Sequence, residues 1–535
     1  MGKAKEVLYY NDRYKGSLTD EDCDILEELI RVDKENGVVG DLRHIIFNLN
    51  DSDVLQLIED YEIFNNSMHD FEMKTGTLRD EQTIGVCYMY YAGSCILGDS
   101  VGMGKTVEVA GLYNLLKSAY QKGNKRPFRY LMLTEKSLVN QVRNEMIKFT
   151  GEFTDIVRSG EQDEIARFSA NNSYEHDLDY NVVGTHALLT APAFLGWLEQ
   201  ARQFGTNGFP FDLLIVDESS VLGGKSSNAI VQSFNSIKKY FKRIIFLNAT
   251  PFETKLDIFY NQLALLDPAM LPTKTNFTKQ YCLMDYRGMY PKPTGKYKNQ
   301  AEFKRLIAYR YFARTRRDKG AVMEDCKGGI IYSPLSDIQK EWLRKTQLNR
   351  VVYDCPSHLD PSIEFNSENV PKLGSLNELL KDQCAEADSI LIFVHFKEAQ
   401  SCLSTWLTNK GYSNRILNGD TKLEDRNEII SGFKNKEYRV LITNVQKGLN
   451  FGSCNYCIFY SFDPNPSKMI QFEGRTTRDF DIIGKNVYVL CSLGQESKQL
   501  QEVVKQRAKA TADMTNTDLS VIMDILLEGT HNETN

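Results

Sequence analysis

The residues of this chain that could do chemistry stand out between Ile96 and Leu116, where the sequence reads ILGDSVGMGKTVEVAGLYNLL. A short apolar run leads into a turn of Gly, Ser and Asp residues, and a helical pattern then begins near Lys105 and Thr106. Strand, glycine-rich loop and helix in this order are typical of loops whose backbone N–H groups surround a phosphate. In such a loop Lys105 would reach the β- and γ-phosphates, and the Thr106 hydroxyl would bind Mg²⁺.

The loop departs at one position from the general pattern G-x-x-x-x-G-K-[ST], because Asp99 stands where that pattern has Gly. Gly-rich turns before helices also occur for purely structural reasons, so the loop needs partners elsewhere in the chain. The residues of this stretch that we predict to bind the nucleotide are Asp99, Ser100, Gly102, Met103, Gly104, Lys105 and Thr106.

Two carboxylates, Asp217 and Glu218, end the apolar run FDLLIVDESS. An acidic pair after a strand can simply cap a helix. Here the pair follows a phosphate loop in the same part of the chain, which favours a catalytic interpretation. Asp217 would hold Mg²⁺ through water, and Glu218 would orient and deprotonate the attacking water.

Alternating strands and helices must position these residues. Polar residues gather at the ends of several apolar runs, which predicts an α/β fold with a parallel sheet and a site along the C-terminal edge of its strands. The runs of the first half lie within 130–133, 181–189, 211–220 and 241–253. A second α/β unit follows, with a strand predicted at 389–396 and a helix that stops at a Gly.

The segment PSKMIQFEGRTTRD, from Pro466 to Asp479, begins as a helix and carries two arginines, Arg475 and Arg478. Their spacing of three predicts one helical face. Surface ion pairing is the structural interpretation. The functional alternative is that both arginines act on the γ-phosphate as arginine fingers.

Two further stretches stay open between a structural and a functional interpretation. TLRDEQTIGV contains Gln82, and a lone Gln in a helix is usually only part of the helix, although its amide can bind both N6 and N7 of adenine. In ARTRRDKG, the basic residues either form a solvated face or line a phosphate-binding groove; they are Arg314, Arg316, Arg317 and Lys319.

Size and composition bound these possibilities. The chain has 535 residues, a net charge of −7 and eleven scattered cysteines, so we expect two or three domains with reduced thiols in a cytoplasm. We find no apolar run of about eighteen residues, which argues against a membrane protein. The net charge argues against a surface that binds nucleic acid everywhere, but it is compatible with a local basic groove.

The sequence divides into five predicted parts. They are an acidic helical N-terminal region at 1–70, a first lobe at 71–270, a linker or insertion at 271–327, a second lobe at 328–493, and C-terminal bracing helices at 494–535.

Taken together, the motifs resemble those of the Swi/Snf-type branch of superfamily-two helicases and translocases. LRDEQTIGV resembles the glutamine motif, and DSVGMGKT resembles that branch's D-E-x-G-x-G-K-T loop, in which Asp99 is expected and Ser100 replaces the usual acid. DESS resembles motif II, with Ser220 where His is usual, and NATPFE resembles motif III. VQKGLNF resembles a shortened motif V and QFEGRTTR resembles motif VI, so the match runs from about residue 75 to about residue 490.

The resemblance implies two RecA-like lobes that bind ATP and Mg²⁺, with nucleic acid lying across both. It adds Arg79, Gln82, Gly448 and Gln471 to the nucleotide-binding residues. It implies nucleic-acid contact or coupling roles for Ser137, Thr185, Ala249, Thr250 and Asn450.

The activity implied is a DNA-stimulated ATPase that tracks double-stranded DNA and displaces bound proteins or remodels DNA structures. One alternative is a strand-separating or fork-remodelling helicase. Another is a transcription accessory factor with ATPase activity that docks on RNA polymerase through residues 1–70; a replication or repair factor is a further possible partner. The compact architecture suggests a bacterial or viral source, and therefore the cytoplasm of a bacterium or of an infected host.

Overall fold

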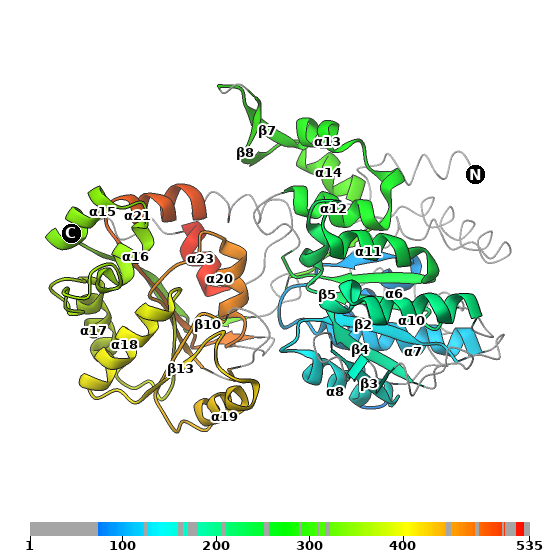
Figure 1. The fold of residues 1–535 in the computed structure, drawn as a ribbon, viewed down its shortest axis with the longest axis horizontal. Helices are drawn as coiled ribbons and strands as arrows, with labels where there is room; N and C mark the ends of the chain where they lie inside the picture. The colour runs from blue at the N-terminus through cyan, green and yellow to red at the C-terminus, as the bar shows by residue number, and fades with distance from the viewer. Residues whose placement is uncertain are drawn as a thin grey trace. The chain divides into compact units, whose positions relative to one another are not determined.

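The computed structural model of the protein describes residues 73–121, 127–158, 164–165, 167–168, 180–204, 209–250, 256–287, 290–307, 310–315, 322–445, 451–452, 454–476, 481–505, 508 and 520–528. The predicted helical region 1–70 lies outside them. The chain forms two compact units (Figure 1). The first falls within Met1–Cys282 and Lys298–Arg314, and the second within Leu283–Tyr297 and Thr315–Asn535.

The first unit is built on a seven-stranded parallel sheet with the order β3-β4-β2-β5-β6-β1-β9. The strands are short apolar runs, and β2 and β4 are buried along their whole length, as expected when helices cover both faces of a parallel sheet. The strands are β1 Cys95–Leu97, β2 Tyr130–Thr134, β3 Thr154–Val157, β4 Asn181–Thr185, β5 Leu213–Asp217, β6 Arg243–Leu247 and β9 Tyr311–Phe312.

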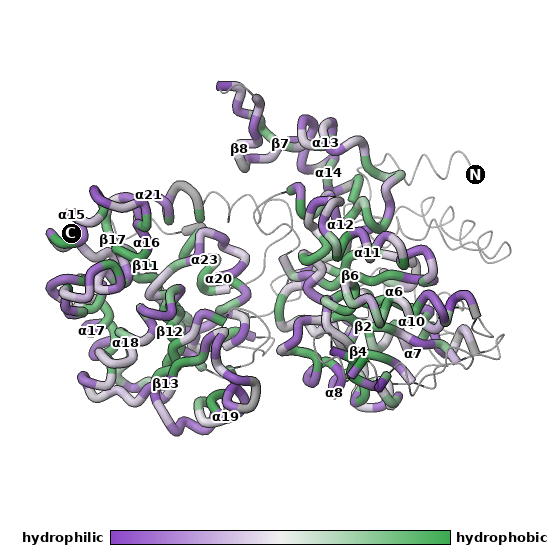
Figure 2. The backbone as a smooth tube through the Cα atoms, in the orientation of Figure 1, coloured by the Kyte–Doolittle hydropathy of each residue, from purple (hydrophilic) through white to green (hydrophobic). Residues whose placement is uncertain are grey.

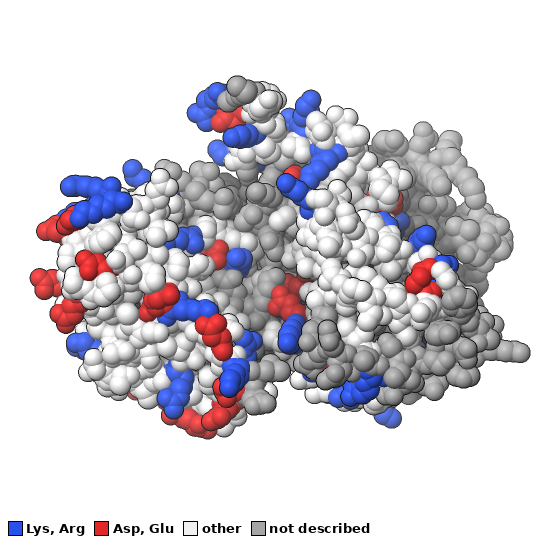
Figure 3. Space-filling model, viewed as in Figure 1, with Lys and Arg blue, Asp and Glu red and all other residues white. Residues whose placement is uncertain are grey.

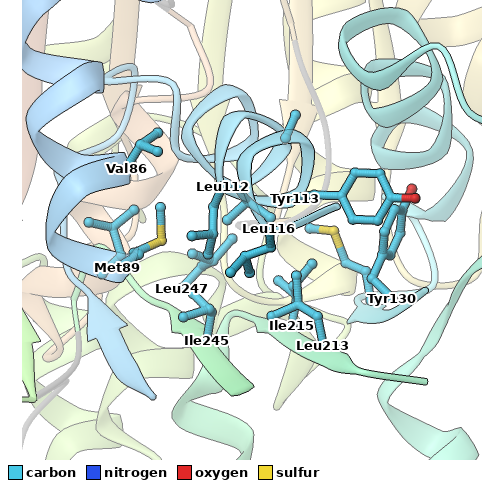
Figure 4. Packing of buried hydrophobic residues seen from close by; sticks show 14 of the residues in the cluster. Val86, Met89, Leu112, Tyr113, Leu116, Tyr130, Leu213, Ile215, Ile245 and Leu247 are labelled. Carbon is cyan, nitrogen blue, oxygen red and sulfur yellow. The ribbon is translucent and has the colours of Figure 1, made fainter. Parts of the chain in front are cut away.

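Helices α6, α7 and α8 pack on one face of this sheet. Side chains of β5 and β6 alternate between the two faces, so Ile245 faces α6 and α7 while Phe246 meets Phe234 of α11 on the other face, with 5.6 Å between the ring centroids. Figure 2 shows hydrophobic segments concentrated along the strands. Figure 4 shows the layer under α6 and α7, where the labelled residues are Val86, Met89, Leu112, Tyr113, Leu116, Tyr130, Leu213, Ile215, Ile245 and Leu247.

The helices of the first unit join successive strands or extend from the sheet. The α-helices are α6 Asp80–Ala92, α7 Lys105–Gln121, α8 Val139–Thr150, α10 Pro192–Phe204, α11 Ala229–Ile237, α12 Leu256–Leu266, α13 Lys274–Tyr281 and α14 Gln300–Ile307. Short 3₁₀ turns are η2 His186–Thr190, η3 Ser219–Gly223, η4 Lys238–Tyr240 and η5 Pro268–Met270.

The segment predicted as a linker, 271–327, differs in the structure. It contains α13, α14 and β9, and β9 pairs with β1 in the first sheet. The first lobe therefore does not end near residue 270. Two residues of strand are too short to give a period-two signal, which is why the sequence pattern did not reveal β9.

The second unit has a six-stranded parallel sheet with the order β11-β17-β15-β12-β14-β13. Leu391 and Phe393 of β12 pack into one core cluster while Ile390 and Ile392 pack into another, so both faces are covered. The strands are β11 Lys327–Ser333, β12 Ile390–Phe393, β13 Asn414–Leu417, β14 Val440–Thr443, β15 Tyr456–Phe459 and β17 Asn486–Ser492, with a small parallel pair β10 Met323–Glu324 and β16 Ile482–Ile483. These two sheets confirm the predicted α/β fold of two RecA-like lobes.

The C-terminal helix α23 is tied to α20 by a buried carboxylate. Glu473, the last residue of α20, accepts hydrogen bonds from the backbone N–H groups of Val521 (3.1 Å) and Ile522 (2.9 Å) at the start of α23. The helical elements of this unit are α15 Asp337–Lys345, α16 Asn349–Asp354, η7 Pro356–His358, α17 Lys372–Asp382, α18 Lys397–Asn409, α19 Leu423–Lys434, α20 Pro466–Glu473, α21 Gln495–Lys498, the π-helical η8 Gln499–Lys505 and α23 Val521–Glu528.

Strands β7 Cys282–Asp285 and β8 Lys292–Tyr297 form a separate two-stranded sheet. The connection between them is short enough only for an antiparallel hairpin. None of the helices in the described part of the chain combines the length and the apolar character needed to cross a membrane.

Candidate nucleotide-binding site

The loop between β1 and α7 has the backbone conformation of a phosphate loop. Gly102 and Gly104 adopt φ values of 90° and 93°, a region that other residues rarely enter. A Cβ atom on Gly104 would lie 2.5 Å from Nε2 of Gln82, so this glycine also allows a close approach. Helix α7 begins at Lys105, and its first N–H groups and its dipole favour an anion at the loop.

The Lys105 ammonium lies across its own loop. Its Nζ donates hydrogen bonds to the carbonyl oxygens of Asp99 (2.5 Å) and Ser100 (3.2 Å). This geometry holds a positive charge beside the loop's N–H groups, where a polyphosphate chain would bind. The predicted roles of Ser100, Gly102, Met103, Gly104 and Thr106 in nucleotide binding remain predictions, and the Met103 side chain is buried.

Helix α6 supports the loop through the predicted glutamine motif. Gln82 Nε2 donates to the Met103 carbonyl (3.2 Å), and Arg79 Nη2 donates to the same oxygen (2.8 Å). Gln82 Oε1 accepts from the Arg79 N–H (3.1 Å). Since an amide has two N–H groups and two acceptor lone pairs, Gln82 keeps one of each for adenine, and that role stays a prediction.

Arg314 forms a buried ionic cluster behind the loop. Its Nε lies 3.1 Å from Asp99 Oδ2, and its Nη2 lies 2.5 Å from Glu108 Oε1. Its backbone N–H donates to Asp99 Oδ1 (2.9 Å), and its carbonyl accepts from the Ser100 N–H (3.1 Å). Arg314 is 5% exposed, and Asp99 and Glu108 are 0% exposed.

This cluster corrects two sequence-based expectations. Asp99, predicted to bind the nucleotide, instead directs its carboxylate to Arg314 and holds the loop from inside the protein. Arg314 belongs neither to a solvated face nor to a phosphate groove; Arg316, Arg317 and Lys319 lie outside the described residues. Burial and the charge of Asp99 raise the pKa of Glu108 to about 8. Burial lowers the pKa of Arg314, but the carboxylates of Asp99 and Glu108 outweigh it and raise the pKa.

The predicted acidic pair follows β5 directly. Asp217 Oδ2 accepts from the Thr134 hydroxyl (3.0 Å), and Oδ1 accepts from the Glu218 N–H (3.0 Å). The Asp217 carbonyl lies 2.6 Å from His186 Nε2. These contacts fix the carboxylate at the C-terminal edge of the sheet.

Sheet register brings this pair level with the phosphate loop. Asp217 of β5 and Leu97 of β1 both pair with Leu247 of β6, which lies between them. Asp217 is therefore two strand spacings, roughly 10 Å, from the residue at which the phosphate loop starts. The prediction that polar residues of separate strands meet at one edge is met by these positions.

Glu218 has an unusual backbone conformation. Its φ and ψ are both 49°, the left-handed region, which costs a non-glycine residue on the order of 1 kcal/mol. The turn that follows is held to α12, since the Ser219 hydroxyl donates to Gln262 Oε1 (2.7 Å) and Asn261 Nδ2 donates to the Gly223 carbonyl (2.7 Å). Ser219, which follows the acidic pair, thus connects this turn directly to α12.

The donor set fits Mg²⁺. Thr106 offers a hydroxyl and Asp217 a carboxylate, and oxygen ligands of this kind are the ones that a hard cation prefers. Within the described residues, no group of three or more His, Cys, Asp or Glu is arranged to hold a metal. A cation bound by one carboxylate, one hydroxyl and phosphate oxygens is the arrangement Mg²⁺ prefers at nucleotide sites.

Residues after β6 reach the same edge. The Asn248 N–H donates to the Leu97 carbonyl (3.1 Å), and Asn248 Oδ1 accepts from the Thr250 N–H (3.0 Å). Asn248 is 1% exposed, and its Nδ2 has no hydrogen-bond partner among the described residues. Thr250 is 6% exposed, so its predicted coupling role would act through neighbours.

In the second unit, Gln471 is buried within α20 and Arg475 follows its end. The prediction that Arg475 and Arg478 share a helical face is wrong for Arg475, because α20 ends at Glu473 and Gly474 caps it. Backbone hydrogen bonds hold Arg475 in a turn: its N–H donates to the Phe472 carbonyl, and its own carbonyl accepts from Phe451. Gly448, Asn450 and Arg478 lie outside the described residues.

Two protein-family models match the sequence of this chain. The SNF2-related domain matches residues 79–402, more than half of the chain, and the helicase conserved C-terminal domain matches residues 371–479. The chain belongs to the SNF2-related family. This membership identifies it as an ATP hydrolase of the helicase class.

Individual SNF2-related proteins share low identity with the chain over most of its length. Mouse "Chromodomain-helicase-DNA-binding protein 1-like" is 23% identical over 492 residues, which are 85% of this chain and 50% of that protein. Chicken "DNA repair and recombination protein RAD54B" is 23% identical, covering 88% of this chain and 56% of that protein. The chain thus spans about half the length of these relatives. The solved structure "Sulfolobus solfataricus SWI2/SNF2 ATPase core in complex with dsDNA" is 18% identical with a TM-score of 0.38, covering 84% of this chain and 94% of that one.

Sequence reasoning missed several residues of this SNF2-related site. Thr134, Asn248 and Gln262 hold motifs II and III in place, yet each is an ordinary polar residue at a strand end or in a helix. Thr134 and Thr185 pair across β2 and β4, so a signal was present in the polar residues that end both runs. Thr185 is buried and Ser137 is half-buried in the turn after β2, and their nucleic-acid roles stay predictions.

Proposed function

We propose that this protein couples ATP hydrolysis to movement along double-stranded DNA and thereby displaces bound proteins or remodels DNA structures. The observation that carries the ATPase part is the register of the first sheet. Leu97, where the phosphate loop starts, and Asp217 both pair with Leu247, so one nucleotide can contact the loop and the acidic pair together.

Each predicted site residue has a separate role in ATP hydrolysis. Lys105 and the N–H groups at the start of α7 bind the phosphates and offset their charge. Glu218, held by its left-handed turn, orients the water and takes its proton as the water attacks the γ-phosphorus in line with the leaving ADP. Thr106 and Asp217 would hold a magnesium ion, which would supply further neutralisation of the phosphate charge. The sequence motif predicts that Arg475 adds positive charge for the transition state.

Two observations support DNA as the partner. The names of the relatives include DNA binding and DNA repair. The Ser137 hydroxyl, half-buried in the turn after β2, is suited to contact phosphates without reading sequence. Such contacts would weaken steeply with salt.

The test is phosphate release with duplex DNA, single-stranded DNA, RNA and no polymer, each at low and high salt. We expect duplex DNA to stimulate most, with a loss of stimulation at high salt. A DNA triplex then tests movement, because a protein that tracks duplex DNA should release the third strand only with ATP. Glu218→Gln is the control and should release none.

Other outcomes overturn parts of the proposal. Stimulation by RNA alone would exclude DNA as the partner. ATP-dependent separation of a forked duplex without triplex displacement would favour a strand-separating helicase. Phosphate release that no polymer changes would leave an ATPase of another kind.

A further inference from the structure

The β7–β8 hairpin carries large aromatic side chains that the protein leaves in solvent. Tyr286 and Tyr290, which lie between the two strands, are each 72% exposed, and Leu283 at the base is 42% exposed. Side chains of this size usually bury most of their surface, and groups of exposed ones mark binding sites. The pair of rings is therefore the first sign of a ligand.

The same hairpin is basic in an acidic protein. Residues 283–298 hold four basic side chains and one carboxylate, whereas the whole chain has a net charge of −7. Figure 3 shows Lys and Arg side chains gathered on this hairpin. Lys292, Lys296 and Lys298 are exposed, and none of them pairs with a carboxylate among the described residues.

The one arginine of the hairpin, Arg287, is paired with Asp285. Arg287 Nε and Nη2 bind Asp285 Oδ1 (3.0 Å) and Oδ2 (2.9 Å), and the Arg287 N–H also donates to Oδ1. Hydrogen bonds from Arg287 lower the pKa of Asp285 to about 2, so the pair stays charged. The positive charge left for a ligand is that of the lysines.

These groups fit unpaired nucleotides better than a duplex. Lysines on one strand face, Lys292 and Lys296, lie about 13 Å apart along β8 and can each meet a backbone phosphate. A tyrosine ring stacks on a base only when the base face is free, as it is in single strands. Duplex grooves are read mainly by Arg, Asn and Gln forks, and the hairpin's arginine is held by Asp285.

We propose that the β7–β8 hairpin is a second nucleic-acid-binding element, which stacks Tyr286 and Tyr290 on unpaired bases and holds the adjoining phosphates with Lys292 and Lys296. The proposal rests on the proposed function only for the class of ligand, since it needs neither ATP nor movement. It gives the protein a contact for single-stranded arms that duplex tracking does not require.

The test measures binding of the full chain, without ATP, to a labelled oligothymidine of about 20 nucleotides and to a blunt duplex of equal length. We expect Tyr286→Ala with Tyr290→Ala to weaken oligothymidine binding by about fivefold or more per ring. Tyr286→Phe with Tyr290→Phe keeps the rings and should stay within about twofold of the wild type. Duplex binding and duplex-stimulated ATPase should be unchanged in both variants.

The lysines give an independent readout. Lys292→Gln with Lys296→Gln should reduce the slope of log affinity against log salt by about 1.4 for the oligothymidine, about 0.7 per phosphate contact. Melting temperatures check that each variant is folded, and the exposure of all four side chains favours this.

Three results of these binding measurements would overturn the proposal. Equal weakening on the duplex would make the hairpin a duplex contact, and unchanged oligothymidine binding would leave a protein partner as its ligand; either result overturns the proposal. A Phe variant as weak as the Ala variant would also overturn it, because the ring would then not be the contact. The wild-type protein could also bind oligothymidine through the hairpin and show no polymer-stimulated ATPase activity. That result would overturn the proposed function and leave the hairpin proposal intact.

Discussion

At the scale of single residues, the site depends on where two charged side chains are held. Lys105 is bonded to the carbonyls of its own loop, and Glu218 is placed by a backbone turn that its neighbours must stabilise. Contacts within the first unit therefore hold both residues in place. Binding of the phosphates and activation of water are separate tasks here, and they can be separated by substitution.

We expect Lys105→Ala to abolish measurable turnover and to weaken ATP binding, because the loop loses its one cation. Glu218→Gln should bind ATP normally and lose about two or more decades of hydrolysis, since the amide cannot take a proton. Binding of a fluorescent ATP analogue and phosphate release measure the two effects. Glu199→Gln, an exposed carboxylate of α10, is the control and should change neither. Normal turnover in Glu218→Gln would contradict the assignment of the base.

Arg314→Met should destabilise the protein strongly, by about 3–5 kcal/mol, because Asp99 and Glu108 would be left as buried carboxylates without their cation. Urea denaturation measures this effect. Arg202→Met breaks an exposed ion pair with Glu199 and should cost no more than about 1 kcal/mol. In Arg314→Lys the charge remains but the fork is lost, so we expect partial recovery of stability and a raised KM for ATP. An unchanged denaturation midpoint in Arg314→Met would show that the cluster does not stabilise the fold.

Sequence alone predicted candidate reacting groups but not the residues that support them. Lys105, Asp217 and Glu218 could be proposed because phosphate and metal chemistry restricts residue type and spacing. Arg314 could not, since it lies over two hundred positions from Asp99 and only the pairing of β9 with β1 brings them together. A sequence pattern reports local periodicity, and this contact is set by topology.

At the scale of elements, α23 depends on a carboxylate that the fold keeps buried. Burial raises the pKa of Glu473 above its usual 4.5, although Lys485 and the N–H groups of Val521 and Ile522 oppose the shift. Above about pH 4.5 and below the raised pKa, the folded protein therefore holds a proton on Glu473 that the unfolded chain has released. The stability gained from that proton is complete below about 4.5 and is lost as pH rises through the raised pKa.

We therefore expect the stability difference between wild type and Glu473→Gln to shrink as pH rises from about 5 to about 8. Urea midpoints at several pH values measure it. Asp285→Asn is the control: the Asp285 pKa is about 2 in the folded protein and 3.8 in the reference state, so its effect should be constant over that range. A difference that grows with pH would show that the Glu473 pKa is lowered instead.

The long apolar runs predicted their strands well, because a parallel strand buried on both faces is apolar throughout. β4, β5, β6 and β12 all lie within the predicted runs, and β2 extends one residue beyond its run. Short or irregular elements were harder to predict from the sequence. The end of α20 at Glu473 depends on a Gly474 cap that a period of three or four residues does not reveal.

At the scale of the whole molecule, the sequence motif predicts that Arg475, which belongs to the second unit, acts as an arginine finger. We expect Arg475→Ala to bind ATP but to lose about two or more decades of DNA-stimulated turnover, because an arginine finger acts in the transition state. Phosphate release and analogue binding separate the two effects. Arg475 is buried, so a melting curve and Arg475→Lys check for loss of fold. Full turnover in Arg475→Ala would mean that the first unit hydrolyses ATP without it.

The pairing of β9 with β1 also affects how the protein is made. Ile96 donates its N–H to the Arg310 carbonyl and Gly98 donates to Phe312, so the strand that carries the phosphate loop gains its outer neighbour only from the far end of the first unit. On the ribosome, the nascent chain must hold β1 with one side unsatisfied until Phe312 has emerged, and an exposed strand edge invites association with other chains. An expression fragment cut near residue 270 would keep that edge open permanently, whereas one extended through Arg314 would close it.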